Sequence, residues 1–193
     1  MSYPALRIRR MFEDRRAVVA ELAALPAGPR LAAALDGLDL SSLDGGERVD
    51  VLVALARQAA HTQARLLAGM AAVATQSVGS GFDSDEVAFA LHLTRRGAQN
   101  QVALAQDLLS RLPMVWSALD GGELCTIRAR IFSDVLAPAP DELAHDIADR
   151  LLPAAAGWTA GQLRAGCYAN YSKPTRHWPR NATNGRSANA GCT

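Results

Sequence analysis

The sequence predicts an all-α fold, a multi-helix bundle that contains a helix-turn-helix-like corner and ends in a disordered tail. Alanine and leucine dominate the 49% of hydrophobic residues, and aromatic residues make up only 5% of the chain. β-Branched residues rarely cluster, so no segment resembles a strand. Apolar residues instead recur at spacings of three and four, the period of a helix. A chain of 193 residues is long enough to bury its own core.

The first part of the chain is expected to hold three helices. Residues 12–25 form the first, and residues 29–35 form a short second helix. Asp44 and Glu47 have the spacing of an acidic capping box, which opens the longest periodic run, residues 47–73. The core-facing stripe of this run is expected to be Leu52, Leu55, Ala59, Gln63, Leu66, Met70 and Val73.

Residues 83–112 are expected to form a short helix, a tight corner and a longer second helix, after a glycine-rich break at residues 79–81. Thr94 lies between the two helices as the expected N-cap. The apolar positions of the second helix, which fit one buried stripe, are Ala98, Val102, Ala105, Leu108, Leu109 and Leu112.

The polar face of this second helix is the candidate DNA-binding site. It begins with Arg95, Arg96, Gln99 and Asn100, just after Thr94, and Gln101 follows on the same polar face. Such side chains reach phosphates and base edges when the start of a helix lies in the major groove. The alternative is a solvated face of arginine and amide side chains that binds nothing.

Four further helices are expected beyond residue 112. They span residues 113–119, 124–136 and 140–152, and the fourth begins at the capping box of Thr159 and Gln162. This last helix is expected to break off after residue 165, where the composition changes abruptly.

The tail, residues 166–193, contains no acidic residue and no Leu, Ile or Val. This composition suggests that the tail is translated in a shifted reading frame. The last base of one codon, read with the first two of the next, must give leucine where Tyr168 follows Cys167, and alanine where Pro179 follows Trp178. Some bases of these codons are not determined by the amino-acid sequence. When G or C is preferred at those bases, the shifted frame encodes a helix followed by charged residues. We therefore predict a truncated chain with an out-of-frame, disordered tail. The alternative is a genuine basic tail.

The net charge of +1 conceals an uneven distribution. Residues 1–165 carry 16 arginines, no lysine and all 19 acidic residues, which gives a net charge of −3. An acidic body restricts any contact with DNA to a local patch. The three cysteines lie at no metal-binding spacing, which fits a reducing cytoplasm. We expect neither a signal peptide nor a membrane span.

These segments resemble the actinobacterial 13E12 repeat family, which carries the domain called domain of unknown function 222. The resemblance covers residues 12–165 and rests on EVAFALHLT, LLSRLPMVWSALDGGEL, RARIFSDVLAP and LLPAAAGWTAGQLRA, of which the last is the most specific. In that family the helical region commonly precedes an HNH nuclease domain and is associated with repeated and mobile genetic elements. No HNH segment is recognisable here, so the resemblance implies no nuclease activity for this chain.

No other motif indicates catalysis, a metal or a cofactor. Asp141, His145 and Asp149 recur every four residues on one helix face, but no further ligands are recognisable elsewhere. An exposed polar stripe is the simpler interpretation. We therefore expect no enzyme activity, no metal site and no cofactor.

Two functions follow from the sequence. The first is a non-catalytic, DNA-associated helical module of a 13E12-repeat protein that lacks its nuclease domain, with residues 94–100 at the DNA. The alternative is a helical interaction or oligomerisation module without DNA contact, favoured by the acidic body and the alanine-rich long helix. The expected partners are DNA or a second copy of the chain, with no membrane and no small-molecule substrate.

The nucleotide sequence of the gene tests the shifted reading frame. The alternative frame beyond codon 165 is expected to run through the tail without a stop codon and to encode a leucine- and alanine-containing helix. Stop codons in that frame, or a loss of helical periodicity, would show that the tail is genuine.

Overall fold

The computed structural model describes residues 19–76 and 84–171, and all regular structure in these ranges is helical, which confirms the all-α prediction. The predicted glycine break at residues 79–81 and the start of the predicted first helix lie outside the described residues. None of the helices in the two ranges combines the length and hydropathy that a membrane span requires. After helical residues 19–24, the elements are α2 (Pro29–Asp36), the 3-10 helix η1 (Leu40–Ser42), α3 (Gly45–Gln76), α4 (Asp85–Ala90), α5 (Arg95–Gln106), the π-helical turn η2 (Asp107–Arg111), α6 (Pro113–Asp120), α7 (Thr126–Leu136), α8 (Asp141–Ala155) and α9 (Ala160–Tyr171).

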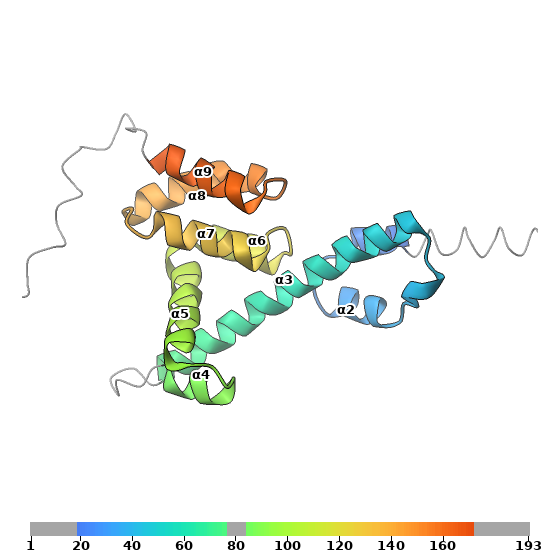
Figure 1. The fold of residues 1–193 in the computed structure, drawn as a ribbon, viewed down its shortest axis with the longest axis horizontal. Coiled ribbons are helices and arrows are strands. Elements are labelled where there is room, and N and C mark those ends of the chain that lie inside the picture. Colours follow the sequence, from blue (N-terminus) through green and yellow to red (C-terminus); the bar gives the residue numbers. More distant parts are fainter. Residues whose placement is uncertain (1–18, 77–83, 172–193) are drawn as a thin grey trace, which may run out of the picture.

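The longest element is α3, whose 32 residues extend about 48 Å at ~1.5 Å per residue. Its N-terminal half lies beside α2, and further along it packs against α4, α5, α6 and α7 (Figure 1). Two separate hydrophobic clusters form along it. In the smaller, Val51 and Ala54 meet buried side chains from residues 19–43. In the larger, Ala60, Leu67 and their neighbours meet side chains from α4 to α9.

The stripe of α3 that the sequence pattern assigns to the core is mostly exposed, so that prediction is wrong. Leu52 is 64% exposed, Leu66 is 42% exposed, and Met70 is the one member of the stripe that is buried. The buried positions of α3 are instead Glu47, Val51, Ala54, Ala60, Ala64, Leu67, Met70, Ala71 and Ala74. Small side chains let neighbouring helices approach closely, so the face richest in alanine is the one that packing selects.

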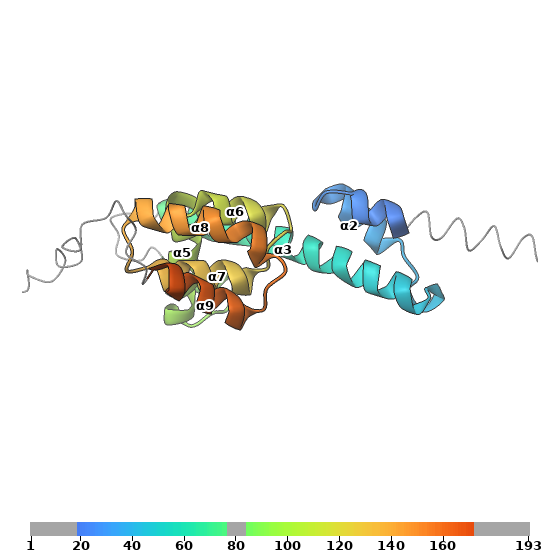
Figure 2. The same ribbon diagram turned by 90° about the horizontal axis from the view of Figure 1, so that it is seen from above.

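Helices α6 to α9 form a bundle in two layers. Figure 2 shows α6 and α8 on one side and α7 and α9 on the other, and the two helices of each layer are in contact. Phe132 of α7 is fully buried at its core. Gly122 lies two residues beyond the end of α6, with a φ of 78°, and a Cβ there would lie 2.8 Å from the carbonyl oxygen of Arg57. Only glycine therefore fits where the end of α6 meets α3.

Both predicted capping boxes are formed. The Glu47 amide donates to Asp44 Oδ1 at 2.8 Å, and the Asp44 amide donates to Glu47 Oε2 at 2.9 Å. At α9, the Thr159 amide donates to Gln162 Oε1 at 2.8 Å, and the Gln162 amide donates to Thr159 Oγ1 at 3.3 Å. These reciprocal bonds satisfy backbone donors that the first turn of a helix leaves unpaired.

The second helix of the corner was predicted to continue unbroken to residue 112, but it ends in the π-helical turn η2. The Leu112 amide donates to the carbonyl oxygen of Asp107, five residues earlier, at 2.9 Å. This wider turn rotates Leu109 out of the core, whereas Leu108 and Leu112 are fully buried.

Helix α9 continues to Tyr171, so the predicted break after residue 165 is wrong by six residues. Cys167 is fully buried in the larger cluster, and Tyr171 packs against that cluster. A Cβ at Gly166 would lie 2.8 Å from the Trp158 ring, so the missing side chain lets α9 pack past the tryptophan. The predicted disorder of the remaining tail concerns residues outside the described ranges, and the shifted reading frame stays a prediction.

The burial of Cys167 predicts a loss of stability at alkaline pH. Burial raises the pKa of this thiol from 9.0 to about 11, and the positive charge of Arg164 offsets part of the effect. The thiol therefore loses its proton at a lower pH in the unfolded chain than in the folded one. Folding stability contributed by the protonated thiol is complete below pH 9 and falls as pH rises toward 11.

Urea unfolding at pH 8 and pH 10.5 measures this loss. Between these values the wild type should lose about 2 kcal/mol more of its free energy of unfolding than Cys167→Ala, which lacks the titrating group. Equal losses for the two proteins would show that the thiol titrates normally and is not buried.

Candidate nucleic-acid interface

Residues 91–94 connect α4 to α5 in a tight turn. His92 has a φ of 52°, the left-handed conformation that residues other than glycine seldom adopt. The Leu93 amide donates to the Ala88 carbonyl oxygen at 2.9 Å and closes the turn. Val87 of α4 and Ala98 of α5 are buried behind it. The two helices thus form the helix-turn-helix-like corner that the sequence predicts.

The five predicted site residues lie together at the start of α5. Thr94 caps the helix, because its Oγ1 accepts a hydrogen bond from the Gly97 amide at 3.0 Å. The opposite side of the helix, with Val102 and Ala105, is buried. The positive end of the helix dipole is therefore presented on an exposed polar face. That face consists of Thr94, Arg95, Arg96, Gln99 and Asn100, all of which are exposed.

The charge on this face is partly neutralised by α4. Arg95 Nε lies 3.1 Å from Asp85 Oδ1 in a surface ion pair. Such pairs contribute little to stability, so a phosphate can replace Asp85 as the partner of Arg95 at small cost. Arg96 makes no ion pair within the part of the chain that the structure describes. The sequence pattern did not indicate the pairing of Arg95.

A third arginine, which the sequence analysis missed, adjoins the same helix. Arg130 of α7 donates from Nη2 to Gln101 Oε1 at 3.0 Å and is half-buried. The two residues are 29 positions apart, and no spacing rule connects them. Gln101 is half-buried and held by Arg130, so it does not belong to the exposed face at the start of α5.

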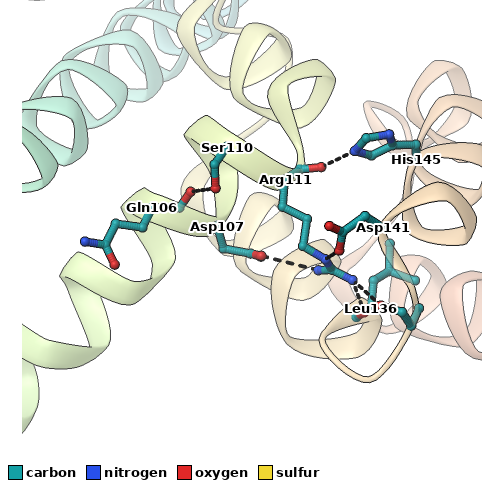
Figure 3. Close-up of polar contacts among 8 residues, drawn as sticks. Gln106, Asp107, Ser110, Arg111, Leu136, Asp141 and His145 are labelled. Atoms are coloured by element: carbon teal, nitrogen blue, oxygen red, sulfur yellow. Dashed lines mark hydrogen bonds and ion pairs between the residues drawn. The ribbon is translucent and has the colours of Figure 1, made fainter. Parts of the chain in front are cut away.

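Beyond α5, Arg111 anchors the π-helical turn to α7 and α8 (Figure 3). Its Nε lies 2.8 Å from Asp141 Oδ1, and its Nη1 lies 3.3 Å from Asp107 Oδ1. Its Nη2 donates to the carbonyl oxygens of Leu136 and Ala139. The side chain is only 14% exposed. It bonds the carbonyl oxygen of Leu136, the last residue of α7, which also accepts from the Ala139 amide, and the carbonyl oxygen of Ala139 in the turn that follows.

His145 completes this cluster from α8, with its Nε2 directed at the carbonyl oxygen of Arg111 (Figure 3). A carbonyl oxygen only accepts, so Nε2 carries the proton. Two of the three residues whose spacing suits a metal, Asp141 and His145, are thus engaged in contacts between helices. The cluster fixes the end of α5 against the bundle and so orients the exposed start of the same helix.

A groove of about 420 Å³ lies between α6 and α8. Its described lining residues include Met114, Ser117, Leu152 and Pro153, and their one titratable side chain is Glu123. A single carboxylate does not form the acid and base pair that general acid–base chemistry uses. The corner therefore remains the better candidate for a functional site.

Comparisons with protein-family models, with curated proteins and with solved structures find no match for this chain.

Replacing Arg111 tests its anchoring role. Arg111→Ala should lower the free energy of unfolding by about 2–4 kcal/mol, because it removes the arginine partner of the Ala139 carbonyl group and of the Asp107 carboxylate, while the Leu136 carbonyl group keeps only its bond from the Ala139 amide. The exposed Asp141, at 75%, contributes little to this loss. Urea denaturation measures the change.

Arg96→Ala is the matched control, because it removes the same charge from an exposed site and should change stability by no more than about 0.5 kcal/mol. A loss below about 1 kcal/mol for Arg111→Ala would contradict the anchoring role.

Proposed function

We propose that this chain is a DNA-associated helical module of the 13E12 repeat type, located in the cytoplasm, and that the helical module itself is non-catalytic. The observation that supports this proposal is the start of α5. Five polar side chains are exposed there on a capped helix whose opposite face is held in the core. A helix supported in this way can enter a groove of DNA without unfolding any of its own contacts.

The residue types assign a role to each part of this face. Arg95 and Arg96 reach phosphates, which position the helix, and the amides of Gln99 and Asn100 face the base edges in the major groove. Asp85 must release Arg95 for this contact, and the carboxylate then stands close to the DNA backbone. Binding should therefore be modest in affinity and strongly reduced by salt.

The rival function is an interaction or oligomerisation module. A different observation favours it, namely the aliphatic side chains that α3 leaves exposed, Leu52 and Leu66 among them. The two functions use separate surfaces, α5 and α3, so each can be tested without disturbing the other.

The double variant Arg95→Ala and Arg96→Ala tests DNA contact. Loss of two phosphate contacts should weaken binding to a duplex at least about tenfold at low salt and reduce the slope of log K against log salt by roughly 2. Fluorescence anisotropy over a salt series measures both quantities.

The matched control is Arg150→Ala with Arg164→Ala, which removes the same charge from exposed positions on α8 and α9. It should leave the affinity and the slope close to those of the wild type. Equal losses in the two double variants would assign binding to net charge and not to α5, and salt-insensitive or absent binding by the intact chain would refute the proposal.

A further inference from the structure

A seven-residue repeat runs along the exposed surface of α3. Its positions alternate at spacings of three and four residues, and a 3.5-residue repeat keeps one line of side chains against a second helix that lies alongside. We call these residues the α3 seam. They are Leu52, Leu55, Ala59, Thr62, Leu66, Gly69 and Val73, and all seven are exposed.

Within residues 19–76 and 84–171, the packing of α3 in both hydrophobic clusters leaves the seam exposed. The N-terminal half of α3 buries Val51 and Ala54 against the smaller cluster, and the C-terminal half buries Leu67 and Ala71 against the larger one. Leu52, by contrast, is 64% exposed. A helix that is apolar on more than one side is typically covered on more than one side.

We propose that the α3 seam binds the same seam of a second copy of this chain, with the two helices antiparallel. In this arrangement Leu52 meets Gly69 of the second copy, Leu55 meets its Leu66, and Ala59 meets its Thr62. The same contacts recur on the other side of the twofold axis, as a self-complementary patch requires.

Side-chain volumes favour the antiparallel orientation. A parallel pair would stack Gly69 on Gly69 and Ala59 on Ala59 between layers of leucine, and these layers would leave voids. The antiparallel pair places Leu52 over the glycine, so a large side chain fills the space that a small one leaves.

Charge also fits a second copy. The seam contains no charged residue, and the flanking Arg65 comes opposite the amide of Gln58 of the second copy, so no like charges meet. Charged flanks commonly set partner choice between paired helices. Because the seam is uncharged, it has no electrostatic preference for a strongly acidic or basic partner. It also has no cationic side chain that could contact DNA phosphates.

The size of the seam predicts weak association. It spans residues 52–73, about 33 Å of helix, with a contact width on the order of 10 Å. Two such seams bury on the order of 1,000 Å² in total, near the lower limit for a specific interface. Dimers should therefore form with a dissociation constant on the order of micromolar.

Sedimentation velocity of the intact chain from about 2 to 200 μM tests the proposal, and the expected result is a shift from monomer to dimer across this range. Leu55→Glu with Leu66→Glu should raise the dissociation constant at least ~100-fold while leaving the circular dichroism spectrum unchanged, because both residues are exposed in the monomer. Val53→Glu is the matched control, since Val53 is exposed on the same helix but lies off the seam.

Disulfide formation tests the orientation. Leu55→Cys mixed with Leu66→Cys should give peptides that link positions 55 and 66, identified by mass spectrometry, and Leu55→Cys alone should give no link between two copies of position 55. A link between positions 55 would overturn the antiparallel arrangement. A chain that stays monomeric throughout would also overturn the proposal, and the seam would then be assigned to a helix of another protein. The proposal would likewise be overturned if Val53→Glu weakened the dimer as much as the seam variant does. None of these variants alters α5, so the outcome is independent of DNA binding.

Discussion

A single turn of α3, residues 57–61, ties the two parts of this structure together. Arg57 donates to the carbonyl oxygens of Ala23 and Leu25 at 3.0 and 2.6 Å. Gln58 accepts a hydrogen bond from the Gly28 amide at 2.8 Å. These bonds satisfy backbone groups of helical residue Ala23 and of Leu25 and Gly28 in the loop before α2. The smaller cluster is therefore attached to α3 by polar contacts as well as by apolar packing.

The other side of the same turn holds the bundle. His61 Nδ1 lies 2.8 Å from the carbonyl oxygen of Asp120 and 3.1 Å from its carboxylate, at the end of α6. Gly122 then packs directly on the backbone of Arg57. Because α3 is one continuous helix, this junction sets where both clusters lie along it. Among the described residues, the α3 seam and the polar face at the start of α5 are exposed.

Local patterns were predicted correctly from the sequence, because they depend on residues three or four positions apart. The two capping boxes, the Thr94 cap and the exposure of Arg96 and Asn100 belong to this class. The buried side of α3 could not be predicted in the same way. The spacing of leucines identifies an apolar stripe on α3. Whether the leucine stripe or the alanine-rich stripe is buried depends on how closely distant helices approach, and in this structure the alanine-rich stripe is buried.

Contacts between distant segments explain the other differences. Arg130 reaches Gln101 from another helix, and Arg111 joins carbonyl groups more than 20 positions away. Cys167 is buried because α9 packs on α7, although the local sequence resembles an unstructured tail. The position of the candidate site was thus visible in the sequence, whereas its ion pair with α4 and its support by the bundle required the fold.

The most direct test of the account is a nuclear magnetic resonance titration of the ¹⁵N-labelled chain with a short DNA duplex at low salt. The account predicts that amide shifts concentrate between Thr94 and Asn100 and that α8 and α9 remain unchanged. Shifts centred on α8 and α9, or no shifts at saturating DNA, would contradict the assignment of the α4–α5 corner as the surface that meets DNA.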